Sequence, residues 1–176
     1  EVEIDGVGLN PTRTAVLPVL ERFGALIEQT IDRTDAGEPV GRIRVRHGSL
    51  RPVTIEAGEV PGLIDELPAL AALAAAGGEL VVHGAAELRV KESDRITALV
   101  GGLRALGAEA EEFPDGFHIR GGRLRGGTVD AAGDHRLAMA FALAALAARN
   151  PSVITGADSV VVSYPGFFET LDGLRA

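Results

Sequence analysis

Two nearly uninterrupted runs of small apolar residues, LPALAALAAA at 67–76 and LAMAFALAALAA at 137–148, decide the choice of fold. Neither run contains a charged side chain, and a helix that is apolar on every face is typical of a protein interior. Both runs are shorter than the about 20 residues that cross a bilayer, which makes a membrane helix the weaker interpretation. Helices of such small cross-section fit inside a ring of sheets. We therefore expect an α/β protein whose Ala-rich helices are buried.

The chain also contains an internal repeat of a helix, a Gly-Ala turn and an acidic-ended strand. The repeat is found by shifting the sequence by 83 residues. A shift by 69 residues places Asp65, which precedes the first Ala-rich run, on Asp134, which precedes the second. Repetition on this scale indicates a fold built from copied units. The residues that coincide under the first shift are Thr14, Leu20, Gly24, Ala25 and Glu28 with Thr97, Leu103, Gly107, Ala108 and Glu111.

Composition places the chain among globular proteins of one domain and excludes several functions. Its 176 residues carry a formal net charge of -8, which argues against binding to nucleic acid or to an anionic membrane. The absence of cysteine excludes disulfides, zinc–thiolate sites, iron–sulfur clusters and a cysteine nucleophile, and fits a cytoplasmic location. Because the chain opens at Glu1 with residues that already alternate like a strand, we expect a piece of a longer polypeptide.

Two segments place basic side chains where a helix is expected to begin. RVKESDR at 89–95 leads into a helix predicted over about 92–106, and DHR at 134–136 opens one predicted over about 134–148. The positive end of a helix dipole disfavours a cation by about 0.3–1 kcal/mol. A bound anion would resolve this conflict, because helix N–H groups and basic side chains would both point at it. The two segments together favour an anion-binding site.

The alternative for these segments is a purely structural role. Asp94 and Asp134 can satisfy the two helix dipoles and pair with the neighbouring arginines. Against this, Lys91 is the only lysine among 17 basic residues, and lysine differs from arginine in shape and hydration. Lys91 and Arg95 would share one helix face if the helix begins early enough.

Asp65, followed by Glu66 and the first Ala-rich run, allows two interpretations. Aspartate is a common N-cap residue, and the pattern slightly favours that role. The functional interpretation is a base held at the mouth of the core. One carboxylate can serve both purposes.

Gly101 and Gly102 lie inside the helix predicted over 92–106. Each glycine in a helix interior costs about 1 kcal/mol relative to alanine. Close packing against a neighbouring element would justify this cost.

Several of these segments closely resemble 5-enolpyruvylshikimate-3-phosphate synthase. The specific motifs are LRVKESDR at 88–95 and GDHRLAM at 133–139, in this order and spacing. GLNPTR at 8–13, LIDELP at 63–68 and VSYP at 162–165 add support. The resemblance extends over essentially the whole chain and corresponds to the C-terminal portion of the family, somewhat under half of the enzyme.

The resemblance implies two domains, each an inside-out α/β barrel built from βαβαββ repeats with Ala-rich helices buried inside. Residues 1–176 would form one of them as a single domain, with the N-terminal domain absent. It also implies transfer of the enolpyruvyl group from phosphoenolpyruvate to the 5-hydroxyl of shikimate-3-phosphate, releasing phosphate. This step belongs to the shikimate route to chorismate and aromatic amino acids, and the family needs no metal or organic cofactor. Without its partner domain we expect the chain to be inactive.

The family's functional residues carry over to five positions. Asp65 matches the carboxylate that contacts the shikimate hydroxyls and serves as a base. Lys91 matches the lysine that touches shikimate-3-phosphate, and Glu92 matches the acid/base that works on the methylene carbon of phosphoenolpyruvate. Arg95 and Arg136 match the arginines that bind phosphoenolpyruvate. Two arginines suit a substrate that carries a carboxylate and a phosphate.

One position departs from the well-known form of the family. Val162 stands where that form has a lysine, and in the family this lysine bears on a phosphate contact and on the response to glyphosate.

Two other functions compete with this one. UDP-N-acetylglucosamine enolpyruvyl transferase shares the fold but has different motifs. A non-catalytic anion-binding module is the alternative from another class. The reading frame upstream of Glu1 would discriminate between an enzyme and a module.

Overall fold

The computed structural model describes residues 1–174 and contains helices and strands in alternation. The helices are α1 (Val16–Phe23), α2 (Leu67–Ala75), α3 (Arg95–Leu106), α4 (His135–Leu146) and α5 (Phe167–Gly173). The strands are β1 (Val2–Gly8), β2 (Leu26–Asp35), β3 (Glu38–Arg46), β4 (Pro52–Ile55), β5 (Glu79–Val82), β6 (Glu109–Phe113), β7 (Gly116–Arg120), β8 (Thr128–Asp130) and β9 (Val153–Thr155). Short 3-10 helices are η1 (Val60–Gly62), η2 (Ala86–Val90) and η3 (Ala157–Val162).

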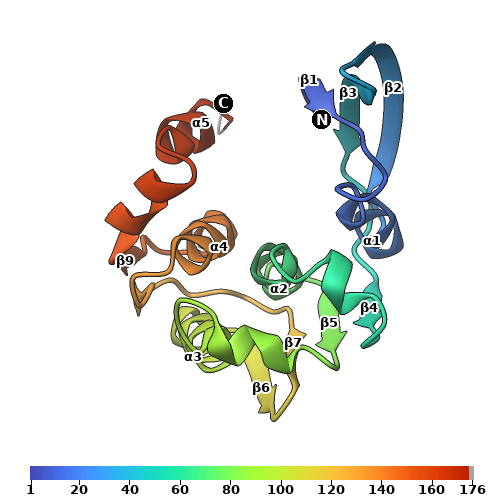
Figure 1. Cartoon of the computed structure of the whole chain (residues 1–176). Coiled ribbons are helices and arrows are strands. Elements are labelled where there is room, and N and C mark those ends of the chain that lie inside the picture. The colour runs from blue at the N-terminus through green and yellow to red at the C-terminus, as the bar shows by residue number, and fades with distance from the viewer. Residues whose placement is uncertain (175–176) are drawn as a thin grey trace.

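The strands form three separate sheets, with orders β1-β3-β2, β4-β5-β7-β6 and β8-β9. β4 and β5 are parallel and joined through α2, and β8 and β9 are parallel and joined through α4. β7 pairs antiparallel with both β5 and β6. The sheets lie around the helices rather than between them (Figure 1). The expected α/β arrangement with helices inside is therefore confirmed.

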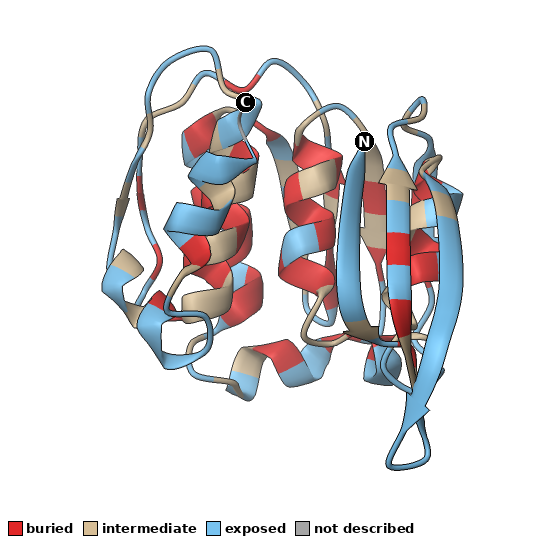
Figure 2. Cartoon of the chain, turned by 90° about the horizontal axis from the view of Figure 1, so that it is seen from above, coloured by how far each residue is buried: buried red, intermediate tan, exposed pale blue. Residues whose placement is uncertain are grey.

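The Ala-rich helices occupy the core because their small side chains allow close approach. Seven of the nine residues of α2 and half of the residues of α4 are buried, and the two helices pack against each other. In Figure 2 the inner helices are largely red, the colour of buried residues, whereas the strands near the N-terminus are largely pale blue, the colour of exposed residues. In the described part of the chain, no helix is both long and apolar enough to span a bilayer.

The internal repeat corresponds to repeated structure. α1 and α3 both end at a glycine in the left-handed conformation, Gly24 with φ 106° and Gly107 with φ 104°. An antiparallel hairpin follows each, β2-β3 in one case and β6-β7 in the other. α2 and α4 are likewise equivalent, since each joins two parallel strands. The copied unit is thus complete in β4-α2-β5-α3-β6-β7.

The two adjacent glycines of α3 have opposite surroundings. A Cβ atom at Gly102 would lie 2.2 Å from Cζ of Phe141 and 2.8 Å from Cγ2 of Val129, so α3 approaches α4 at this point. A Cβ atom at Gly101 would meet nothing within 4 Å, and that position is exposed. The expectation of close packing is confirmed for Gly102 and wrong for Gly101.

We predict opposite effects for the two alanine variants. Gly102→Ala should lower the free energy of unfolding by about 1–3 kcal/mol, because the buried Phe141 ring must move. Gly101→Ala should raise it by up to about 1 kcal/mol, because alanine is the better helix former. Urea unfolding of both variants measures this. A stabilising Gly102→Ala would contradict the packing described here.

Candidate functional site

The first residues of α3 and α4 meet at a buried ion pair. Arg95 begins α3 with 1% of its surface exposed, and its Nε donates a hydrogen bond of 2.6 Å to Oδ2 of the fully buried Asp134. Asp134 also caps α4, because its Oδ1 accepts the backbone N–H groups of Arg136 at 2.9 Å and Leu137 at 3.4 Å. Ser93 donates its hydroxyl to the same carboxylate at 3.2 Å. One carboxylate therefore caps one helix and orients the guanidinium group of the other.

Asp65, just before α2, joins this pair to a second arginine. Its Oδ2 lies 2.9 Å from Nη2 of Arg136, and its Oδ1 lies 3.6 Å from Nη1 of Arg95. Arg136 also donates from Nη1 to the backbone oxygen of Asp65 at 3.1 Å. Glu92 pairs with Nη2 of Arg95. We call Asp65, Glu92, Arg95, Asp134 and Arg136 the arginine–carboxylate cluster.

The predicted helix caps are confirmed in two cases and wrong in one. Asp94 caps α3 and pairs with Arg89 at 2.9 Å, and Asp134 caps α4 as described above. Asp65 does not cap α2, because the N-cap position belongs to Glu66 and carries no side-chain hydrogen bond. The structural interpretation of Asp94 and Asp134 is therefore correct, and Asp65 is left to contact the two arginines.

Lys91 lies apart from the expected arrangement. The helix begins at Arg95 rather than near Glu92, so Lys91 precedes it in extended backbone and does not share a helix face with Arg95. Its Nζ pairs with the Glu87 carboxylate. Within residues 1–174, no hydrogen bond or ion pair joins Lys91 to the arginine–carboxylate cluster. The helix does not include Lys91, because Asp94 is the N-cap of α3 and its Oδ1 accepts the backbone N–H of Thr97.

The pKa values of two carboxyl groups at the site are shifted in opposite directions. Burial alone would raise the pKa of Asp134, but the hydrogen bond and charge of Arg95, with two backbone N–H groups, hold that pKa below its usual range. The pKa of Glu66 is raised, chiefly by burial and then by the neighbouring Asp65 charge. Asp134 is therefore held as an anion, while Glu66 is biased towards its neutral form.

The cluster has the chemistry of a site for a small anion with a proton-transfer step. Arg95 and Arg136 supply two guanidinium groups, which suit carboxylate or phosphate oxygens. Nη1 of Arg95 is buried and makes no hydrogen bond. The Asp65 and Glu92 side chains are 44% and 53% exposed, so both can reach a molecule outside the protein. The described residues contain no group of three or more His, Cys, Asp or Glu side chains that could hold a metal ion.

The sequence model for EPSP synthase (3-phosphoshikimate 1-carboxyvinyltransferase) matches residues 1–171. A 3-phosphoshikimate 1-carboxyvinyltransferase from Acidithiobacillus ferrooxidans is 52% identical over 95% of this chain and 39% of its own length. The relative of the same name from Thermus thermophilus is 50% identical over 97% of this chain and 40% of its own. This chain thus spans about two fifths of the length of these relatives.

Solved structures agree with the sequence matches. An EPSP synthase from Acinetobacter baumannii superposes with a TM-score of 0.89 and 39% identity, covering 98% of this chain and 41% of that one. The enolpyruvyl transferase NikO from Streptomyces tendae superposes with a TM-score of 0.70 and 21% identity, over 98% of this chain and 38% of that one. The fold is therefore of the enolpyruvyl transferase class. With a family match over nearly its whole length, the chain belongs to the EPSP synthase family.

The sequence indicates no site role for Asp134 or Ser93, although it predicts that Asp134 pairs with a neighbouring arginine. The signal for Asp134 is that it precedes an Ala-rich run expected to be buried. Arg89 pairs with Asp94 and Glu112 and donates to the backbone oxygens of residues 113 and 114, so it fastens the start of α3 to the β6-β7 hairpin. The pairing with Asp94 is one that the sequence predicts, whereas no spacing indicates the contacts with residues 112–114, which lie more than 20 residues from Arg89.

We predict that Asp134→Asn destabilises the chain in a pH-dependent way. The variant leaves the buried Arg95 without its fully buried counter-charge, which costs on the order of 3 kcal/mol at pH 7. Because the folded-state pKa of Asp134 is depressed, its contribution is complete above the unfolded value of about 3.9 and is lost as the pH falls through the folded value. The difference between wild type and variant should therefore shrink below about pH 4.

Urea unfolding between pH 7 and pH 3 measures this difference. Asp158→Asn is the matched control, because Asp158 is exposed and the substitution should change stability little at any pH. Equal unfolding midpoints for wild type and Asp134→Asn at pH 7 would show that the ion pair is not needed.

Proposed function

We propose that this chain is the C-terminal domain of a cytoplasmic, two-domain 3-phosphoshikimate 1-carboxyvinyltransferase. The enzyme transfers the enolpyruvyl group of phosphoenolpyruvate to the 5-hydroxyl of shikimate-3-phosphate and releases phosphate. The observation that carries this proposal is the convergence of Arg95 and Arg136 with Asp65 at the starts of α2, α3 and α4. Membership of the family supports it, as do the names of the relatives at about 50% identity.

Arg95 and Arg136 are assigned to phosphoenolpyruvate. In the free chain the Nη atoms of Arg95 face Glu92 and Asp65, so substrate oxygens would take the places of these carboxylates. Nη1 of Arg95 is already without a hydrogen bond and offers a donor to an incoming oxygen. Asp134 keeps its contact with Nε and holds the guanidinium in place during the exchange. The site is thus preorganised for an anion, and charge-assisted hydrogen bonds replace ion pairs within the protein.

The two exposed carboxylates are assigned to proton transfer. In the addition step the substrate hydroxyl oxygen bonds to the central carbon of phosphoenolpyruvate, while a proton is added to the methylene carbon. In the elimination step phosphate leaves and a proton departs from that same carbon, which restores the double bond. Asp65 takes the hydroxyl proton, and Glu92 delivers and removes the proton at carbon.

Shikimate-3-phosphate is assigned partly to this chain and partly to the remaining three fifths of the family's length. Asp65 contacts its hydroxyl groups, and Lys91 turns from Glu87 towards its phosphate. The missing portion supplies the other basic residues and closes the site against water. The share of the relatives that the chain covers supports this division.

Our prediction for the carboxylates is a loss of turnover rather than of affinity. In the full-length enzyme, Asp65→Ala and Glu92→Gln should lower kcat by about 10²–10⁴-fold and change KM much less, because general acid–base catalysis acts on the transition state. Steady-state phosphate release measures both constants. Glu111→Gln, an exposed glutamate on β6, is the matched control and should behave as wild type. A raised KM with unchanged kcat would contradict the assigned roles.

We further predict that residues 1–176 alone do not turn over substrate. Rate acceleration requires both substrates in a near-attack geometry, which one half of the site does not provide. The measurement is phosphate release from phosphoenolpyruvate and shikimate-3-phosphate, with and without the separately expressed N-terminal portion. Restoration of turnover by that portion is the expected result. Full activity of the 176 residues alone would mean that the site is complete within them.

A further inference from the structure

The loop of residues 91–94, between η2 and α3, carries Lys91 and Glu92 and has no regular structure of its own. Within residues 1–174, no hydrogen bond between backbone groups involves residues 91–93. Segments with few hydrogen bonds and exposed side chains are the ones that open most easily. The Glu92 side chain is 53% exposed. Its position therefore depends on contacts that fix the loop from outside.

Arg89, in the last turn of η2, uses all five N–H donors of its guanidinium group. Nε donates to the backbone oxygen of residue 114 at 2.8 Å, and Nη2 donates to that of residue 113 at 2.6 Å and to Glu112 at 2.9 Å. Nη1 donates to both carboxylate oxygens of Asp94, at 2.9 and 3.1 Å, and to the Thr97 hydroxyl at 3.2 Å. A planar guanidinium with every donor occupied is held in one orientation.

These contacts hold the 91–94 loop at both ends. Arg89 lies two residues before the loop and Asp94 is its last residue, so the ion pair between them closes the loop on itself. Asp94 also caps α3, since its Oδ1 accepts the backbone N–H of Thr97 at 3.1 Å. Closure of a short segment between fixed ends restricts the conformations that are open to it. We call the Arg89 side chain and its partners the loop clamp.

The loop clamp is attached to a rigid part of the protein, the β6-β7 hairpin. β7 lies between β5 and β6 in the four-stranded sheet, and its Phe117 and Ile119 are fully buried. The Thr97 hydroxyl donates to Glu112 on β6 at 2.9 Å, so α3 contacts the same hairpin. Arg89 therefore fastens the loop to the sheet rather than to another exposed segment.

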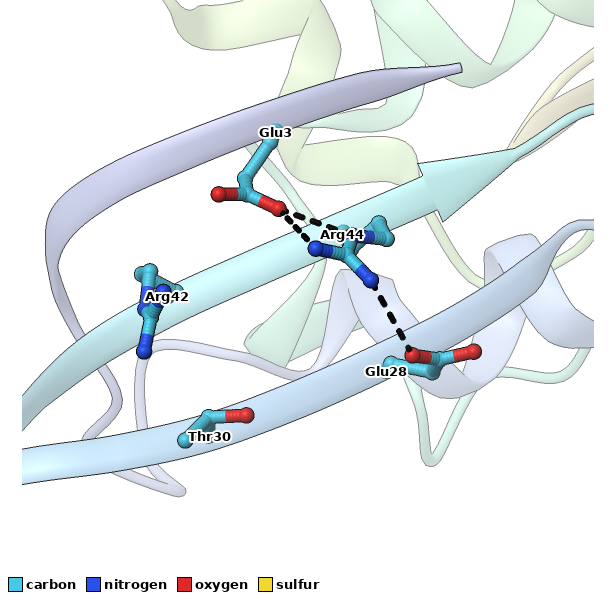
Figure 3. Close-up of a pocket in the computed structure, with 5 residues that line it drawn as sticks. All are labelled: Glu3, Glu28, Thr30, Arg42 and Arg44. Atoms are coloured by element: carbon cyan, nitrogen blue, oxygen red, sulfur yellow. Dashed lines mark hydrogen bonds and ion pairs between the residues drawn. The ribbon is translucent and has the colours of Figure 1, made fainter.

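Arg44 on β3 provides a contrast, because it also lies between two acidic side chains. It pairs with Glu3 on β1 at 2.5 Å and with Glu28 on β2 at 3.9 Å (Figure 3). The Arg44 side chain is 44% exposed, against 25% for Arg89. Exposed ion pairs of this kind contribute little to stability or orientation. Arg44 thus belongs to the surface, whereas Arg89 also binds two backbone oxygens and is fixed by them.

The other side of the loop faces the arginine–carboxylate cluster. Glu92 pairs with Nη2 of Arg95. Ser93 donates its hydroxyl to the buried Asp134 at 3.2 Å. In the described part of the chain Arg89 makes no hydrogen bond or ion pair with the cluster, so its effect on the site must pass through the loop. In the proposed function substrate oxygens displace Glu92 from Arg95, and the loop clamp then remains to hold the Glu92 backbone.

We propose that Arg89 is a positioning residue for the reaction, which holds the 91–94 loop against the β6-β7 hairpin so that Glu92 reaches the substrate. This inference rests on the proposed function and deepens it, because Glu92 is the group assigned to proton transfer at carbon. Arg89 itself touches neither the substrate nor a proton that moves. A displacement of about 1 Å from the productive position can cost on the order of 10²-fold in rate, so loss of the clamp has a measurable effect.

Turnover of the full-length enzyme tests this role. Arg89→Met keeps the apolar stem and removes all five donors, and it should lower kcat by about 10–100-fold. KM for phosphoenolpyruvate should change by less than about 3-fold, because Arg95 and Arg136 keep their own partners. Arg44→Met is the matched control, since it removes an arginine from between two carboxylates on a different sheet, and it should behave as wild type. Unchanged kcat in Arg89→Met would overturn the proposal.

A double variant separates positioning from a general effect on the fold. Because Arg89 acts through Glu92, the addition of Arg89→Met to Glu92→Gln should lower kcat by less than about a further 2-fold. Asp94→Asn keeps the N-cap and weakens the clamp, so it should lower kcat by about 3–10-fold even if Arg89→Met does not fold. An Asp94→Asn variant as fast as wild type would contradict the inference.

Failure of this inference and failure of the proposed function give different results. A slow Glu92→Gln variant in which Arg89→Met retains its full effect overturns the positioning role alone. A Glu92→Gln variant as fast as wild type shows that Glu92 does not transfer the proton, and the positioning role is then overturned together with that assignment.

Discussion

The ion pair between Arg95 and Asp134 is the contact on which the site depends. Both side chains are buried, and removal of one partner would leave the other as an uncompensated charge in the interior. Asp134 is also bonded to two backbone N–H groups of α4, so the pair fixes the relative position of two helices as well as one guanidinium. A surface arginine would cost less to keep but would be free to rotate. Burial of Arg95 therefore costs stability but fixes the orientation of its guanidinium group.

The approach of the helices that makes this pair possible rests on small side chains. α2 and α4 pack closely because alanine occupies most of their length, and α3 reaches α4 where Gly102 leaves room for the Phe141 ring. With larger residues at these positions the helix starts would stand further apart. The same packing that forms the core therefore sets the distances within the arginine–carboxylate cluster.

The cluster contains three carboxylates and two arginines, so it is slightly acidic although the proposed function requires it to bind an anion. Asp65 and Glu92 pair with the Nη atoms of the arginines. In the proposed function, substrate oxygens take the places of these carboxylates, which then lie beside the bound molecule. The same contacts that neutralise the arginines would thus also position the groups proposed for proton transfer.

The fold class was readable from the chain itself, because it depends on local patterns. The Ala-rich runs indicated buried helices and the two shifts indicated copied units. The resemblance to the family marked Asp65, Lys91, Glu92, Arg95 and Arg136 as site residues, and all of these except Lys91 meet in the cluster. The side-chain partners were not readable, because each depends on segments far apart in sequence: Asp65 caps nothing and binds Arg136, and Asp134 serves α3 as well as α4. The helix start at Arg95, which separates Lys91 from the cluster, was settled by the cap at Asp94. Propensity and periodicity act within a few residues, whereas a buried charge finds its partner only when the chain has packed.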